Sequence, residues 1–244
     1  MEDDASPGGS RGLSLDVIMV IFDNLELPLA DLAPYRRCCK AMSEYVVRTV
    51  RRFDASTAPR TQQSDSGAWL RSVLDTYCHL EELQCGGLTL SDNDGVLASC
   101  LGGGRLPNLR VLDLFDSAGV TDSAVVNLSS GCPQLRVLTL GGSLRRHGAR
   151  LTNAAVEAVS TLCVHLEALH LNCCYQVTDA AVSVLAQQRG PELRAVTLSR
   201  CGKMTDASVL ALAAAAPNLQ FVNVGGVGRA DAFSRRASSL IILH

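Results

Sequence analysis

The nine residues VTDAAVSVL at 177–185 recur, with few changes, as MTDASVLAL at 204–212. A leucine-led phrase precedes each copy, and six such phrases occur along the chain, 26–31 residues apart. They are LEELQC at 80, LRVLDL at 109, LRVLTL at 135, LEALHL at 166, LRAVTL at 193 and LQFVNV at 219. A fixed period in the twenties is typical of solenoids, in which each repeat is one unit of a stack. The sequence therefore predicts a solenoid over about residues 80–230.

Each repeat is predicted to combine a short strand with a helix. In the leucine phrases, apolar residues alternate with others, as Leu169 and Leu171 do around His170, which indicates a strand with one buried face. Further apolar residues follow at offsets 0, 4, 5 and 8, which places them on one face of a helix. These sets are Val120, Ala124, Val125 and Leu128; Leu151, Ala155, Val156 and Val159; Val177, Ala181, Val182 and Leu185; and Met204, Ser208, Val209 and Leu212.

A threonine stands just before each of these helices, where its hydroxyl can accept a free amide proton as an N-cap. The next residue is acidic in three of the four repeats, which the helix dipole favours. The threonines are Thr121, Thr152, Thr178 and Thr205, and the following residues are Asp122, Asn153, Asp179 and Asp206.

Composition restricts the class of protein. The chain has 244 residues with only 4% aromatics, so the core must consist mainly of Leu, Val and Ala. The net charge is −2, which gives a nucleic-acid partner little electrostatic support. No secretory signal and no apolar run of about 20 residues is found, so we expect no membrane span and an intracellular location, cytoplasmic, nuclear or both. The ten cysteines are then expected to be free thiols.

A different pattern precedes the repeats. Apolar residues from Val17 to Leu25 form a helical stripe that is wide for so short a segment, which favours docking on a partner helix surface. The stretch VVRTVRRF at 46–53 is expected to be the last helix of this region. A linker is expected at 53–67, and a helix at 68–80 is expected to lead into the first repeat.

The repeats resemble the cysteine-containing subtype of leucine-rich repeats. Cys174 and Cys201 occupy the subtype's first cysteine position, where two other repeats have Ser117 and Ser143. A second cysteine position, three residues before the next leucine, holds Cys132 and Cys163. The resemblance implies an α/β solenoid, a leucine-rich-repeat right-handed superhelix of about six repeats.

The region before the repeats resembles an F-box, a small all-α domain. Asp16, Asp31 and Lys40 agree with the family pattern, whereas Ser14, Cys38 and Met42 depart from it. The resemblance implies that residues 13–52 bind a Skp-type adaptor. The implied adaptor-binding residues are Leu13, Val17, Ile18, Ile21, Phe22, Leu25, Leu32, Cys39 and Met42.

Together these expectations divide the chain into a disordered N-terminus at 1–12, an F-box-like domain at 13–52, a linker at 53–67, leucine-rich repeats with their leading helix at 68–233, and a tail at 234–244. The tail SSLIILH is expected either to pack as a last segment or to fray. The insertion at 144–150 is expected to be a solvated loop.

The same resemblance implies a substrate-recognition adaptor of an SCF-type E3 ubiquitin ligase. The chain would be a monomer within a hetero-complex, bound through a Skp-type adaptor to a cullin–RING ligase, and would hold a protein substrate for ubiquitination and proteasomal degradation. It would itself be non-catalytic and need no cofactor. The alternative is a leucine-rich-repeat scaffold in a cytoskeletal or cell-cycle assembly, without a ligase.

The substrate is expected on the concave side of the coil, because strand residues that alternate with the inward leucines face it. The candidates are Glu82, Gln84, Val111, Asp113, Phe115, Thr139, His170, Asn172, Thr197, Ser199, Phe221 and Asn223.

Two kinds of chemistry are disfavoured by the same sequence. The stretch CVHLEALHLNCC at 163–174 is rich in metal-binding residue types, but the repeat already accounts for Cys163 and Cys174 as core positions, and no Cys-x-x-Cys spacing occurs, so no metal site is expected. No cysteine stands out with a histidine partner and an orienting group, so no nucleophilic catalysis is expected either.

Overall fold

The computed structural model describes residues 50–55, 66–88, 101, 103–117, 119–143, 150–225 and 241–243. All of them belong to the second of two compact units, residues 50–244. The segment 1–49, and with it all the predicted adaptor-binding residues, lies outside the described residues. So does the greater part of the insertion at 144–150.

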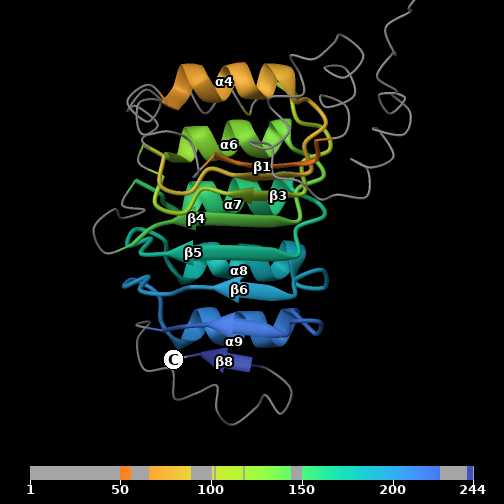
Figure 1. Ribbon diagram of the computed structural model, residues 1–244. Helices are drawn as coiled ribbons and strands as arrows, with labels where there is room; N and C mark the ends of the chain where they lie inside the picture. Colours follow the sequence, from red (N-terminus) through yellow and green to blue (C-terminus); the bar gives the residue numbers. More distant parts are fainter. Residues whose placement is uncertain are drawn as a thin grey trace, which may run out of the picture. The chain divides into compact units, whose positions relative to one another are not determined.

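The described residues form one parallel sheet of eight strands, stacked in chain order (Figure 1). The strands are β1 (Arg52–Asp54), β2 (Glu82–Gln84), β3 (Val111–Asp113), β4 (Val137–Gly141), β5 (Ala168–Asn172), β6 (Ala195–Thr197), β7 (Phe221–Asn223) and β8 (Ile241–Leu243). The six leucine phrases supply β2 to β7, and each pairs with its neighbours in sequence order. The predicted α/β solenoid is therefore confirmed.

Helices stack in the same order beside the strands (Figure 1). They are α4 (Ser66–Thr76), α6 (Asp122–Gly131), α7 (Asn153–Leu162), α8 (Asp179–Arg189) and α9 (Asp206–Ala215). All four predicted sets of helical core residues are buried, from Val120 to Leu212. Within the described ranges, no helix combines the length and the apolar character that a membrane crossing requires.

The core is continuous because the strands share one register. A single row of inward side chains, each 0% exposed, crosses six strands: Leu83, Leu112, Leu138, Leu169, Val196 and Val222. Truncating a buried Leu to Ala typically costs about 2–5 kcal/mol, so this row is a major source of stability. Leu112, Leu138, Leu169 and Val196 each pack between two repeats, which is why a repeat cannot be stable alone.

Two strands extend the sheet beyond the six predicted repeats. The helix predicted for 46–53 is wrong at Arg52 and Phe53, which begin β1. Phe53 is 7% exposed and pairs with Leu83, so it extends the inward row, and Arg52 forms an ion pair with Glu82 (3.1 Å). At the other end, β8 pairs with β7, so the predicted tail contributes a strand.

The cysteine positions serve the turns between repeats. Cys132, Cys163, Cys174 and Cys201 are all fully buried, as predicted. The Cys201 thiol donates to the Leu171 carbonyl of the preceding repeat (3.6 Å). At the equivalent place, the Ser117 hydroxyl donates to the Cys85 carbonyl (2.6 Å). Serine therefore replaces cysteine here because either side chain can bond a buried carbonyl.

A second set of contacts links the helix starts of successive repeats. The Asp122 carboxylate accepts from the backbone N–H (2.8 Å) and the hydroxyl (2.6 Å) of Thr152 in the next repeat. Asp179 accepts the same two bonds from Thr205 (2.8 and 2.7 Å) and a third from the Ser208 hydroxyl. The sequence predicted only the dipole role of these carboxylates and missed that each one joins two repeats.

One predicted cap is wrong. Thr121, Thr152 and Thr205 each accept a helix amide proton, but Thr178 makes no such bond. Asn153 explains the difference. Its Oδ1 accepts from the Thr178 N–H (2.9 Å), as an aspartate would, while its Nδ2 donates to the Thr178 hydroxyl (2.9 Å). An amide donor at this place occupies the hydroxyl oxygen that would otherwise cap α8.

Replacing Asp179 with Ala should lower the free energy of unfolding by about 1.5–3 kcal/mol, the range for hydrogen bonds to charged groups. Asp206→Ala is the matched control. It lies at the same helix position, but the described residues give it no such donors, so it should lose only the dipole contribution of about 0.3–1 kcal/mol. Urea unfolding of both variants measures the difference, and equal losses would contradict the role of Asp179 between repeats.

The same site predicts a pH dependence. Burial acts to raise the pKa of Asp179, but hydrogen bonds from Ser208 and Thr205 outweigh it and hold the pKa below its usual value. Its contribution is therefore fully present above the ordinary carboxyl pKa of about 4 and is lost as the pH falls through the lower, folded-state pKa. The stability difference between wild type and Asp179→Ala should shrink over that interval.

Candidate protein-binding face

The strand residues that alternate with the inward row form one exposed side of the sheet, which we call the open face. Ten of the twelve predicted substrate-binding residues lie in β2, β3, β4, β5, β6 and β7, and Phe115 and Ser199 follow just beyond β3 and β6. Pairing brings them into rows across the strands. One row contains Gln84, Asp113, Thr139, His170, Thr197 and Asn223, and another contains Glu82, Val111 and Phe221.

Eleven of these twelve side chains are half-buried or exposed, so they are accessible to a partner. Thr197 is the exception, because it is only 7% exposed and its hydroxyl is hydrogen-bonded to Nδ1 of His170 (2.8 Å). Its predicted role in contacting substrate is therefore corrected to one of holding His170. Alternation along the strand identified the face that Thr197 lies on but not this cross-strand bond.

Two other candidates accept backbone hydrogen bonds that the sequence analysis did not predict. The Asp113 carboxylate accepts from the Phe115 N–H (2.8 Å), and the Asn223 side-chain oxygen accepts from the Gly225 N–H (3.0 Å). Both bonds shape the turn at the end of a strand, as Asp and Asn side chains commonly do two residues before a turn. An Asp or Asn at this spacing before a turn was the signal that could have revealed the role.

His170 is the titratable group nearest the middle of the open face. Burial lowers its pKa below the usual 6.5, and the Asp113 carboxylate on β3, two strands away, opposes the shift only in part. The imidazole is therefore neutral at physiological pH, so the middle of the face offers a partner hydrogen bonds rather than a positive charge.

A hollow lies where β3, β4, β5 and β6 end. Its lining is Phe115, Gly142, Ser143, Asn172, Cys173, Ser199 and Arg200. The sequence analysis singled out Phe115, Asn172 and Ser199 but missed the other four, because alternation identifies residues within strands and not those in the turns that follow.

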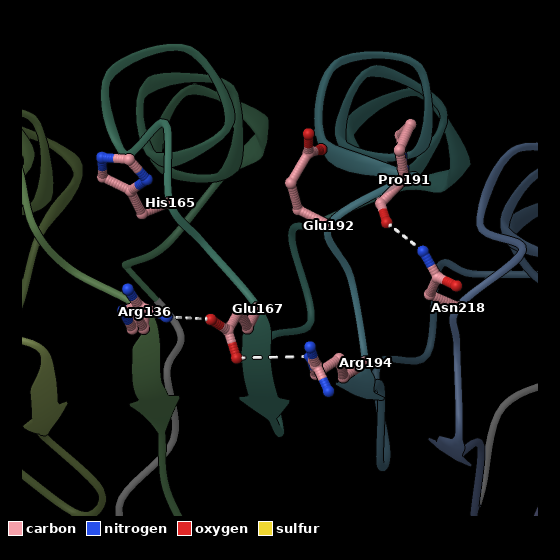
Figure 2. A pocket seen from close by; sticks show the side chains of 7 residues that line it. All are labelled: Arg136, His165, Glu167, Pro191, Glu192, Arg194 and Asn218. Carbon is pink, nitrogen blue, oxygen red and sulfur yellow. Dashed lines mark hydrogen bonds and ion pairs between the residues drawn. The ribbon is translucent and has the colours of Figure 1, made fainter.

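A second pocket lies at the opposite edge, where β4, β5 and β6 begin. Figure 2 shows its lining: Arg136, His165, Glu167, Pro191, Glu192, Arg194 and Asn218. The lining contains no serine, threonine or cysteine that could act as a nucleophile. It joins three repeats, since each repeat contributes a residue just before its strand.

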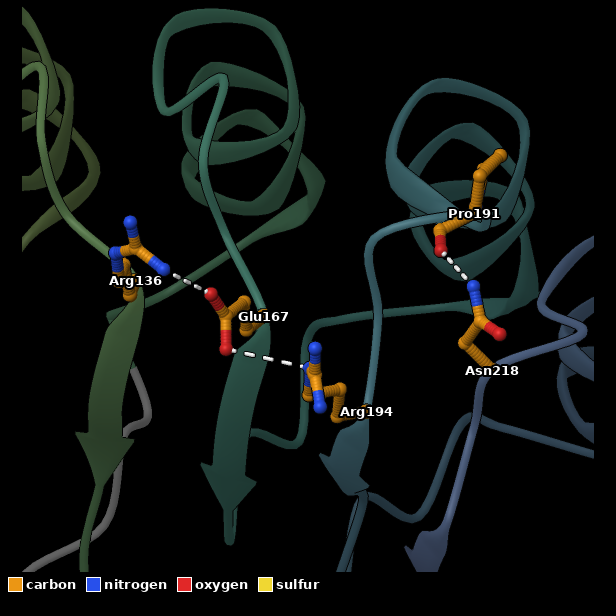
Figure 3. Close-up of polar contacts among 5 residues, drawn as sticks. All are labelled: Arg136, Glu167, Pro191, Arg194 and Asn218. Carbon is orange, nitrogen blue, oxygen red and sulfur yellow. Dashed lines mark hydrogen bonds and ion pairs between the residues drawn. The ribbon is translucent and has the colours of Figure 1, made fainter.

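Ion pairs account for most of the charge at this edge (Figure 3). Glu167 accepts from Arg136 through one carboxylate oxygen and from Arg194 through the other (3.4 Å). The same arrangement occurs at Glu81, between Arg51 (3.5 Å) and Arg110 (3.3 Å). Exposed pairs of this kind contribute about 0–1 kcal/mol each, so they favour the register of neighbouring repeats without dominating stability.

The buried thiols are poorly suited to nucleophilic chemistry. Burial raises the pKa of Cys132 to about 12 and that of Cys163 to about 11. A hydrogen bond from Cys174 lowers the pKa of Cys201 against the effect of burial, but Cys201 is 0% exposed and has no access to a substrate. Among the described residues, no three His, Cys, Asp or Glu side chains come together as metal ligands would.

Comparison with known proteins supports a leucine-rich-repeat protein. Antagonist of mitotic exit network protein 1 of Eremothecium gossypii is 35% identical over 150 residues, 61% of this chain and 36% of that protein. F-box/LRR-repeat protein 4 of Bos taurus is 36% identical over 72 residues, 30% of this chain and 11% of that protein. This chain thus spans about a third or less of these relatives.

No protein-family model matches the chain. Among solved structures, the complex of Rad7 and Elc1 in yeast is similar with a TM-score of 0.48 and 15% identity, covering 83% of this chain and 70% of that one.

The lowered pKa of His170 makes stability depend on pH. The unfolded chain binds a proton at this residue more readily than the folded chain, so stability falls as the pH drops below 6.5. His170→Gln removes the group and should lose less stability than wild type between about pH 7.5 and about pH 5.5. Urea unfolding at the two pH values measures this, and parallel losses in the two proteins would contradict the assignment.

Proposed function

We propose that the protein is a substrate-recognition adaptor of an SCF-type E3 ubiquitin ligase. Residues 13–52 bind a Skp-type adaptor, and the repeats hold a target protein. The chain carries no catalytic step, because other subunits transfer ubiquitin and the target is then degraded by the proteasome.

The observation that carries this proposal is the order of the two parts in one chain. An F-box-like segment precedes, in the same chain, a solenoid whose open face presents mixed, half-buried side chains over six neighbouring strands. Extended faces of stacked repeats suit polypeptides, whereas the pocket residues at either edge include no nucleophile paired with a base. The likeness to F-box/LRR-repeat protein 4 of Bos taurus supports the same combination.

The physical effect of such an adaptor is a raised effective concentration. A tethered target meets the activated ubiquitin in an intramolecular step, which can exceed the rate of free encounter without any new catalytic group. The solenoid would hold the bound target along its open face, and residues 13–52 would link it to the ligase.

A second candidate function is a cell-cycle scaffold that works without a ligase. The specific observation in its favour is the 35% identity to antagonist of mitotic exit network protein 1 of Eremothecium gossypii. In this case the open face would bind a cell-cycle protein and sequester it. Met42, at a position where the F-box pattern has tryptophan, also favours this reading.

Changing both Ile18 and Ile21 to Asp should abolish capture by a purified Skp-type adaptor, because it places two charges in the apolar stripe. The matched control changes Val126 and Leu210 to Asp. These residues are 38% and 45% exposed on α6 and α9, so the control adds the same charge without altering the stripe. The control protein should be captured like wild type.

Equal capture of the stripe variant and wild type would defeat the ligase proposal. The same variant separates the two functions in cells. Under the ligase proposal, a cell-cycle defect caused by loss of the gene is rescued by the control protein but not by the stripe variant. Rescue by both proteins would favour the scaffold.

A further inference from the structure

The hollow at the ends of β3, β4, β5 and β6 originates in a repeated backbone turn. Four strands, β2, β3, β5 and β6, are each followed at the same position by a residue in the left-handed region: Gly87 (φ 76°), Asp116 (φ 58°), Cys173 (φ 54°) and Arg200 (φ 57°). Left-handed backbone turns the chain off the sheet. The side chains at and just before this position therefore stand in a line along the edge of the open face.

The repeat that contains β4 breaks this line, because it has two glycines there. Gly141 corresponds to Phe115, Asn172 and Ser199, and Gly142 corresponds to Cys173 and Arg200. Gly141 cannot be replaced, since its φ is +85° and a Cβ would lie 2.0 Å from the Asn172 carbonyl oxygen. Because β4 and β5 approach closely at Gly141, the line of side chains is interrupted there. The interruption leaves a hollow of about 420 Å³.

The walls of the hollow have a definite chemical character. Phe115 provides an apolar wall on one side, and Asn172 and Ser199 provide half-buried polar groups on the other. Among the described residues, neither of these two polar side chains has a hydrogen-bond partner. They are therefore free to bond a group that enters from the solvent.

The only formal charge in the lining is the guanidinium of Arg200, which is exposed and forms no ion pair with a described carboxylate. Asp116 is the acidic residue at the equivalent position after β3, and its carboxylate already accepts a hydrogen bond from the backbone N–H of Ser143. Arg200 differs in this from Arg110, Arg136 and Arg194 at the other edge, each of which is paired with a glutamate. Its charge is thus available to a ligand.

We propose that this hollow is an anchor site for an acidic side chain, Asp or Glu, of a bound polypeptide. The carboxylate would pair with Arg200 and accept bonds from Asn172 and Ser199, while the carbon atoms beside it contact Phe115. Arginine matches carboxylate geometry with two parallel hydrogen bonds, and pockets with one such anchor often dominate the affinity of a protein interface. The inference rests on the proposed use of the open face for a protein target, and it names the chemistry that is selected.

The test is selection of peptides from a random library displayed on phage, against the purified full-length chain. Each peptide is joined to the coat protein through its C-terminus, so any selected carboxylate comes from a side chain. Wild type should enrich peptides with Asp or Glu next to an apolar residue. Arg200→Glu should lose this preference, while the control Arg194→Glu, with the same charge change at the other end of β6, should keep it.

Fluorescence anisotropy then compares a selected peptide with its Glu→Gln or Asp→Asn counterpart. The loss of the carboxylate should weaken binding to wild type about tenfold and leave binding to Arg200→Glu unchanged or stronger. No selected peptide, no acidic preference, or the same preference in Arg200→Glu would each overturn the proposal. The assay contains no Skp-type adaptor, so failure of adaptor capture leaves its result unaffected, and failure here leaves adaptor capture unaffected.

Discussion

Packing between successive repeats is the interaction on which the structure depends. A strand such as β3 has three residues, of which only Leu112 points fully inward, and burial of one leucine is worth about 1.5–3 kcal/mol. Ordering a repeat of nearly thirty residues costs far more, because fixing the backbone of each residue costs about 1–2 kcal/mol of conformational entropy. The deficit is met only when the buried strand and helix residues of one repeat pack against those of the next, as Leu112 does between Leu83 and Leu138, so stability belongs to the interfaces between repeats.

Polar contacts then hold the register of these interfaces at two places. Asp122 and Asp179 bind the threonine that begins the next helix, and Glu81 and Glu167 each bridge the arginines on either side. The two sets of contacts differ in how much they contribute to stability. The aspartates satisfy backbone N–H groups that a helix start leaves open, whereas the glutamates form exposed pairs that water can replace. The sheet edge with the exposed pairs can therefore vary more readily than the helix starts.

Much of this fold follows from sequence, because a period of 26–31 residues fixes which residues face inward. The helical core sets from Val120 to Leu212 and the buried cysteines were found this way. What sequence did not supply are pairwise relations between repeats. The sequence predicts a helix at Arg52 and Phe53 because a three-residue strand such as β1 has no period of its own. The bonds of Thr178 and Thr197 depend on a neighbour 25 or 27 residues away. Likewise, the hollow beside Gly142 exists only because other repeats have side chains there.

The proposed binding of a protein target and the proposed anchor site both require the stacked strands and their open face. The most direct test of the stack is methyl NOE spectroscopy on the inward row. The structure predicts contacts from Leu83 to Leu112, Leu112 to Leu138, Leu138 to Leu169, Leu169 to Val196, and Val196 to Val222. Contacts that skip a repeat, such as Leu138 to Val196 without Leu169 between them, would contradict the stack.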